Sequence, residues 1–115
     1  HGTVLLTGGG GAHVVTISSA ELYYPASGTC ASTGNSTAVR ASHTATRRPS
    51  GEVLIAGGGG AGTAIVKTGE LYSGGVFTAT GSLSTSREFH TATLLPTGKV
   101  FFAGGYDGSG FVNAQ

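Results

Sequence analysis

The sequence repeats itself with a period close to 50 residues. Three motifs recur at spacings of 47 or 49 residues: an apolar run closed by Gly-Gly at residues 2–9, 51–58 and 98–105, His-Thr-Ala-Thr at 43–46 and 90–93, and Glu-Leu-Tyr at 21–23 and 70–72. A repeat of about 20–50 residues is one structural unit that buries its apolar face only against its neighbours. The period therefore constrains the fold of this chain more tightly than its composition does.

One period, residues 41–87, reads as four short strands separated by turns. The strand candidates are residues 43–46, 53–56, 65–72 and 76–80, and Gly or Pro lies in the turns between them. The second candidate is a continuous apolar run, which is typical of a strand covered on both faces. No segment has the periodicity of a helix. Since four antiparallel strands form one propeller blade, the sequence predicts an all-β β-propeller.

The 115 residues divide into a complete blade between two partial ones. We assign residues 1–40 to strands 2–4 of a first blade and residues 41–87 to a complete second blade. Residues 88–115 supply strands 1 and 2 and the start of strand 3 of a third blade. These make about two and a third blades, whereas a closed propeller has about four or more. We therefore expect further blades as partners, either from copies of this chain or from the rest of a longer one.

The order of the motifs resembles the kelch repeat in its bacterial-type form. Residues 87–105 follow the pattern Arg-x-x-His-Thr-Ala-Thr-Leu-Leu-Pro-x-Gly-Lys-Val-x-x-Ala-Gly-Gly almost throughout. Residues 20–34 follow Ala-Glu-Leu-Tyr-Asp-Pro-x-x-Gly and the later Thr-Gly, with Tyr24 in place of the usual Asp. The resemblance covers the whole chain and implies four-stranded kelch-like blades around a central axis.

Kelch-like propellers also form the catalytic domain of galactose-oxidase-like copper enzymes, which this chain resembles distantly. Those enzymes use Tyr, His and a Tyr–Cys crosslink. The chain offers these residue types, for example Tyr23, Tyr72 and Cys30. However, Tyr23 and Tyr72 occupy equivalent positions of the repeat, which predicts that they pack in the core. No pair of histidines outside the repeat pattern lies near them. The sequence therefore predicts no catalytic residue, no metal site and no cofactor.

Arg40 and Arg87 each precede a repeated His by three residues. In kelch propellers, arginines near the blade-to-blade loops line the ring mouth and grip acidic ligands, so the resemblance implies ligand binding for both. The alternative is a structural ion pair or a contact with a backbone carbonyl. His43 and His90 occupy equivalent positions of neighbouring blades, and we expect them to serve the repeat through hydrogen bonds in turns or between blades.

Two further side chains are candidates for chemistry outside the repeat pattern. Asn35 begins an Asn-Ser-Thr sequon in a predicted loop, which makes it a candidate for N-glycosylation. Cys30 is the sole cysteine, so it cannot form an internal disulfide. It aligns with Phe77, 47 residues later, which we predict to lie in the core. We therefore expect Cys30 to be a small core residue, with an intermolecular bridge as the alternative.

Charge is scarce, with six Lys and Arg against five Asp and Glu. There is no basic stripe for nucleic acid and no run of about 18 apolar residues for a membrane span. The polar residues are mostly Ser, Thr and Gly, which favours an extracellular or cell-surface location.

The sequence predicts a non-enzymatic kelch-type propeller module that binds a protein or glycan ligand or serves structural assembly. One alternative is a fragment of a kelch-like copper-radical oxidase or carbohydrate-acting enzyme whose chemistry lies outside these residues. The other is a self-assembling ring or filament subunit.

Overall fold

The computed structural model describes residues 3–9, 18–59, 65–107 and 110. These residues form nine strands and no helix: β1 (Val4–Thr7), β2 (Ala20–Tyr24), β3 (Thr29–Ser32), β4 (Thr44–Arg47), β5 (Val53–Ala56), β6 (Gly69–Ser73), β7 (Val76–Thr80), β8 (Thr91–Leu94) and β9 (Val100–Ala103). The predicted all-β class is confirmed. Within these residues no helix is long and apolar enough to cross a membrane.

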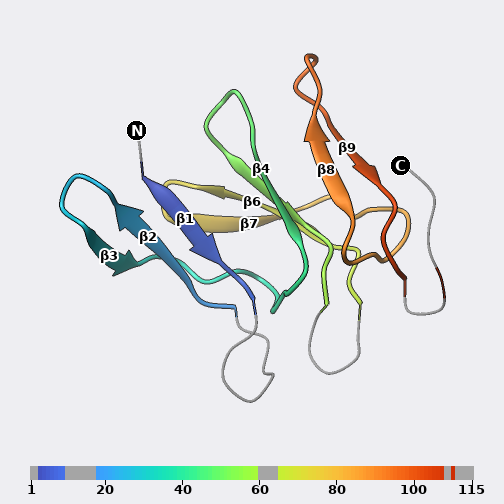
Figure 1. Ribbon diagram of the computed structural model, residues 1–115, viewed down its shortest axis with the longest axis horizontal. Coiled ribbons are helices and arrows are strands. Elements are labelled where there is room, and N and C mark those ends of the chain that lie inside the picture. The colour runs from blue at the N-terminus through green and yellow to red at the C-terminus, as the bar shows by residue number, and fades with distance from the viewer. Residues whose placement is uncertain (1–2, 10–17, 60–64, 108–109, 111–115) are drawn as a thin grey trace.

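The strands form three antiparallel sheets that lie side by side (Figure 1). Sheet 1 has the order β1-β2-β3, sheet 2 the order β4-β5-β6-β7, and sheet 3 consists of β8 and β9. The first strands of sheets 2 and 3, β4 and β8, contact each other. Each sheet is a blade of a β-propeller. The division of the chain at residues 1–40, 41–87 and 88–115 stays a prediction, and the expected start of strand 3 in the third blade lies outside the described residues.

Equivalent positions of the repeat occupy equivalent strands. The three apolar runs before Gly-Gly are β1, β5 and β9, as predicted. β5 ends at Ala56 and is followed by Gly57 and Gly58, whose φ angles of 69° and 100° lie in the left-handed region that favours glycine. This turn bends the chain out of the ladder. The predicted strand at 65–72 is therefore shorter than expected: β6 begins at Gly69, and Ile65 makes only an isolated bridge to Gly59.

The core lies between sheets 1 and 2. Ala20 of sheet 1 is buried against Ile55, Tyr72 and Phe77 of sheet 2. Phe77 is 8% exposed, and the centroid of its ring lies 4.8 Å from that of Tyr72. The prediction that Phe77 belongs to the core is confirmed.

The expectation that Cys30 is a core residue is wrong. Cys30 is exposed and forms no disulfide. It pairs with Tyr23 across β2 and β3, as Phe77 pairs with Tyr72 across β6 and β7. The two positions differ because sheet 1 covers this face of sheet 2, whereas no described residues form a blade over the same face of sheet 1.

Candidate functional site

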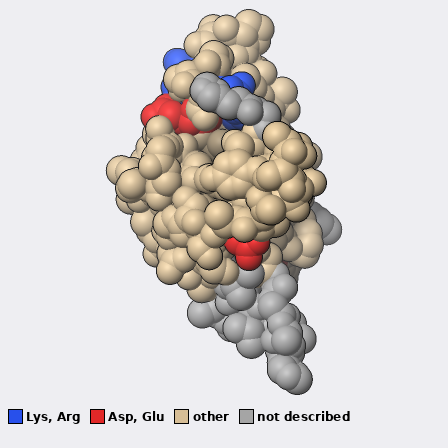
Figure 2. Space-filling model, turned by 90° about the vertical axis from the view of Figure 1, so that its left-hand side faces the viewer, with Lys and Arg blue, Asp and Glu red and all other residues tan. Residues whose placement is uncertain are grey.

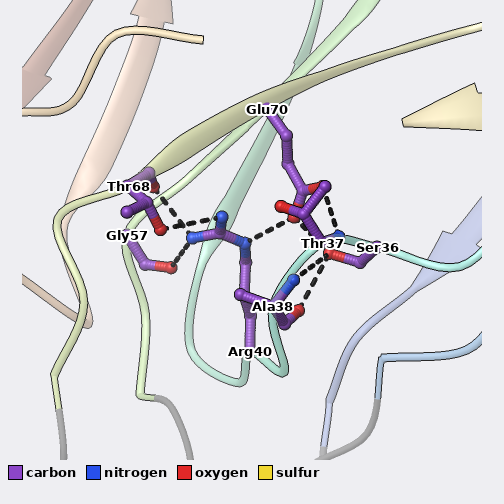
Figure 3. Close-up of polar contacts among 7 residues, drawn as sticks. All are labelled: Ser36, Thr37, Ala38, Arg40, Gly57, Thr68 and Glu70. Atoms are coloured by element: carbon purple, nitrogen blue, oxygen red, sulfur yellow. Dashed lines mark hydrogen bonds and ion pairs between the residues drawn. The ribbon is translucent and has the colours of Figure 1, made fainter. Parts of the chain in front are cut away.

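A buried ion pair joins the segment that enters sheet 2 to the third strand of that sheet. Arg40 Nε donates to Glu70 Oε2 at 3.0 Å, and the two side chains are 1% and 0% exposed (Figure 3). The rest of the guanidinium is also occupied. Nη1 donates to the carbonyls of Gly57 and Thr68 at 3.1 and 2.8 Å, and Nη2 donates to Thr68 Oγ1 at 3.1 Å. Arg40 therefore ties three separate segments together.

Glu70 receives two further donors from the same connecting segment. The Ser36 hydroxyl donates to Oε2, and the Thr37 backbone N–H donates to Oε1 at 2.7 Å. Together with Arg40, these donors form hydrogen bonds to both carboxylate oxygens of Glu70 (Figure 3). A buried charge is tolerated only when it is paired and hydrogen-bonded in this way. We call Ser36, Thr37, Arg40 and Glu70 the Arg–Glu clamp.

The clamp keeps Glu70 ionised. Burial acts to raise the pKa of the Glu70 carboxyl, but the hydrogen bonds from Ser36, Thr37 and Arg40 outweigh burial and leave this pKa below its ordinary value. The carboxylate form is thus the one that the fold selects. The charge of this carboxylate is paired with Arg40 and hydrogen-bonded by Ser36 and Thr37.

The segment that carries the clamp also bridges sheets 1 and 2 further out. Thr33 Oγ1 lies 2.8 Å from the Tyr72 hydroxyl, and the Gly34 N–H donates to the carbonyl of Gly75 at 3.2 Å. Residues 33–40 follow directly after β3 and lead into β4. They therefore lie along sheet 2 from the turn between β6 and β7 to the start of β4.

The repeated histidines are wedged between neighbouring blades. A Cβ atom on Gly8 would lie 2.7 Å from His43 Cε1, and one on Gly57 would lie 2.6 Å from His90 Cε1. Each imidazole thus occupies the space that a side chain on the preceding blade would need. His90 Nε2 also lies 2.9 Å from Thr44 Oγ1 of sheet 2. These contacts agree with the structural role expected for His43 and His90.

Both imidazoles favour the neutral form. Burial and then the positive charge of Arg40 lower the pKa of His43, against a smaller opposing effect of Glu70. Burial and then the charge of Arg87 lower the pKa of His90, although the backbone of Ala56 acts to raise it. Protonating either ring would place a cation beside an arginine in a partly dry interface.

The loops before β4 and β8 carry the other unusual feature. Ser42 and Phe89, at equivalent positions of the repeat, have φ angles of 59° and 55°. Such angles are rare for residues other than glycine, most of all for a bulky side chain. The Phe89 N–H donates to the carbonyl of Ser42 at 3.1 Å, and the Phe89 side chain is 70% exposed. Strained, exposed residues of this kind tend to cluster at functional sites.

The side chains of the two arginines expected to bind a ligand are buried inside the protein. Arg40 is 1% and Arg87 is 2% exposed. Arg87 Nη1 donates to the carbonyl of Gly104 at 3.1 Å, as Arg40 Nη1 does to Gly57. These are the ion pair and carbonyl contacts of the alternative interpretation. Ligand binding by Arg40 and Arg87 stays a prediction, and an acidic ligand would have to reach groups that the blade already surrounds.

Asn35 is exposed in the segment between β3 and β4, and its glycosylation stays a prediction. Sequence reasoning missed Glu70 as the partner of Arg40. The available signal was that Glu and Arg both recur with the repeat, in a chain with only five acidic residues. It also missed the strain at Phe89, because a φ angle leaves no trace in residue type when the residue is not glycine.

A groove lies between sheets 1 and 2 and shares Leu5, Leu22, Val53 and Tyr72 with the core cluster. Its volume is about 740 Å³, and its walls include Leu5 and Leu22 of sheet 1 and Val53 and Tyr72 of sheet 2. Among the described residues that line it, Arg47 at the end of β4 is the one that carries a charge. The groove is therefore mainly an incompletely filled interface between two blades, with Arg47 on its wall.

No protein-family model matches the chain, and no curated protein sequence matches it. Among solved structures, the fold is similar to that of a fungal alcohol oxidase of the AA5 family in complex with copper. The TM-score is 0.79 at 22% sequence identity, and the match covers 95% of this chain. The chain spans about a quarter of the length of that oxidase, since 25% of it is covered. At this identity the likeness supports the β-propeller fold.

The described residues do not fit a copper centre of the Tyr, His and Tyr–Cys kind. No three His, Cys, Asp or Glu side chains among them gather as metal ligands. The imidazoles of His43 and His90 are wedged against glycines of the preceding blade, and Cys30 is exposed on the outer strand β3. The Tyr72 hydroxyl is already hydrogen-bonded to Thr33.

Proposed function

We propose that these blades are scaffold in the propeller of a copper-dependent alcohol oxidase, with the metal site outside the described residues. The observation that carries the proposal is the structural match along 95% of the chain to a copper-bound alcohol oxidase. The poor fit of the described side chains to copper is consistent with a scaffold role. In this role the Arg–Glu clamp and the wedged histidines fix the angle between blades.

The scaffold also positions the loops at one end of the blades. The loops before β4 and β8 are linked by the bond from Phe89 N–H to the carbonyl of Ser42. The residues after them are anchored by His43 and His90. A rigid frame beneath strained loops is the arrangement by which a propeller supports a site that further segments complete.

The test uses the complete product of the gene that encodes these residues. We expect about one copper per polypeptide and copper-dependent formation of hydrogen peroxide from a primary alcohol, measured by elemental analysis and a peroxidase-coupled assay. The 115-residue chain alone is expected to hold no stoichiometric copper. A complete gene product that takes up no copper and oxidises no alcohol would overturn the proposal.

A second candidate is a non-enzymatic kelch-type module that binds a protein or glycan ligand or serves assembly, at the cell surface or outside the cell. The exposed aromatic side chain of Phe89 favours it, because an aromatic ring presented by a rigid frame is a common anchor for a ligand. Under this candidate, Phe89→Ala abolishes ligand capture, and the complete gene product carries no copper.

A further inference from the structure

Sheets 1 and 2 present the same face of the repeat, but other described residues cover only one of these two faces. In sheet 2 the face consists of Val53, Ile55, Glu70, Tyr72 and Phe77, which we call the covered face. In sheet 1 the equivalent positions are Val4, Leu6, Glu21, Tyr23 and Cys30, which we call the bare face. The registers agree: Glu70 pairs with Ile55 as Glu21 pairs with Leu6.

Burial separates the two faces. Ile55 is 1% exposed and Leu6 is 49% exposed; Glu70 is fully buried and Glu21 is exposed. Val4 is 46% exposed. Toward the other described residues, the Glu21 side chain makes no hydrogen bond or ion pair, whereas Glu70 is held by the clamp. Figure 2, which views the molecule from the side of sheet 1, shows a surface that is largely uncharged apart from a few small patches.

The covered face shows what fits such a surface. Three parts cover or extend it: the aliphatic side of sheet 1 with Leu5 and Leu22, residues 33–40 with Arg40, and β4, which pairs with β5. In sheet 1, β1 stands at the edge, although its equivalent β5 is paired on both sides. An unpaired edge strand offers backbone groups to an added strand.

We propose that the bare face of sheet 1 is a docking surface for a segment equivalent to residues 33–47, whose arginine binds this face and whose strand completes sheet 1 as its first strand, as β4 does in sheet 2. Glu21 is the carboxylate that receives the arginine, as Glu70 receives Arg40. β1 accepts the incoming strand along its free edge. The side chains of Val4 and Leu6 stand on the face of the sheet and supply apolar contact there, as Val53 and Ile55 do in sheet 2. The partner is thus a segment with the chemistry of residues 33–47: hydroxyl side chains, then an arginine, then a short β-strand.

The probe is a fluorescent peptide with the sequence of residues 33–47, titrated with the 115-residue chain and followed by anisotropy. We expect saturable binding. Glu21→Gln should weaken it about tenfold, because a charge-assisted hydrogen bond is lost. A peptide with Arg40→Gln should be equally weak on the unchanged chain and should lose nothing more on the Glu21→Gln chain. Glu52→Gln is the matched control, since Glu52 pairs with Arg48 at a separate turn, and binding should be unaltered.

Glu21 is exposed, so the Glu21→Gln chain should fold, and circular dichroism verifies this. The peptide variant tests the same contact without any change to the chain. No saturable binding, or equal binding by the Glu21→Gln and unchanged chains, would overturn the proposal. A dimer in sedimentation that Glu21→Lys dissociates would also overturn it, because the occupant would then be a second copy of this chain.

Discussion

The covered face of sheet 2 and the bare face of sheet 1 carry equivalent residues in the same register, but their environments are opposite. Glu70 lies fully buried among three donors, whereas Glu21 is exposed. Phe77 is in the core, and Cys30 is at the surface. In a repeat fold each unit contacts only its neighbours, so the neighbour decides whether a position is core. The local sequence defines the strand, and the adjacent blade defines its burial.

The largest expected effect comes from removing the charge of the clamp. Glu70→Gln should lower the free energy of unfolding by about 3–5 kcal/mol, because it leaves the buried Arg40 guanidinium without its counter-charge. Glu21→Gln, at the equivalent exposed position, should change it by less than about 0.5 kcal/mol. Urea denaturation of both variants measures the difference. Equal losses would mean that the two faces are not distinguished by their neighbours.

A second pair of substitutions compares the apolar parts of the two faces. Phe77→Ala should cost about 3 kcal/mol, because it opens a cavity beside Tyr72 that the adjoining groove lets partly relax. Cys30→Ala should cost well under about 1 kcal/mol, since the thiol is exposed. Thermal unfolding followed by circular dichroism compares the two. A larger shift for Cys30→Ala would contradict the assignment of the bare face.

Two glycines with nearly the same φ angle allow the cost of backbone strain to be separated from the cost of a clash with the next blade. Gly57 and Gly104 have φ angles of 69° and 68°, but a Cβ on Gly57 would lie 2.6 Å from Arg87 O and from His90 Cε1 of the next blade, whereas one on Gly104 would have no described atom within 4 Å. Gly104→Ala should cost about 1–2 kcal/mol from backbone strain alone. Gly57→Ala should cost about 1–2 kcal/mol more, from the clash with the next blade. Chemical denaturation measures the free energy of unfolding of both variants. Equal losses for Gly57→Ala and Gly104→Ala would contradict the clash with the next blade.

The smallest expected effect is on pH. The pKa values of His43 and His90 are lowered on folding from 6.5, so the unfolded chain binds more protons and stability falls as pH drops below about 6.5. The pKa of Glu70 is also lowered on folding, from 4.5, so stability falls further below about pH 4.5. His43→Gln should reduce the first fall. Stability that rises between pH 6.5 and 5 would contradict the lowered pKa values.

The sequence predicted the strands well because the signal is repeated and local. The apolar runs before Gly-Gly became β1, β5 and β9, and Phe77 became core. The prediction failed where burial depends on another blade. Cys30 has the right position for a core residue but no blade over it among the described residues.

The candidate site was less predictable than the fold. Arg40 was singled out, but its partners Glu70 and Thr68 lie 30 and 28 residues away, on a strand and a loop whose placement depends on how the blades pack. The φ angle of Phe89 arises from the turn before β8 and from its bond to Ser42. Neither leaves a local pattern in the sequence.

The coupling free energy between Arg40 and Glu70 tests the central claim most directly. A double-mutant cycle with Arg40→Ala and Glu70→Ala, measured by urea denaturation, should give a coupling of about 1.5–3 kcal/mol, because both ends of one buried contact are removed. The matched cycle with Arg40→Ala and Glu21→Ala should be additive within about 0.5 kcal/mol. Additivity in the Arg40 and Glu70 cycle would contradict the account that this clamp joins the blades and makes one face of the repeat a core.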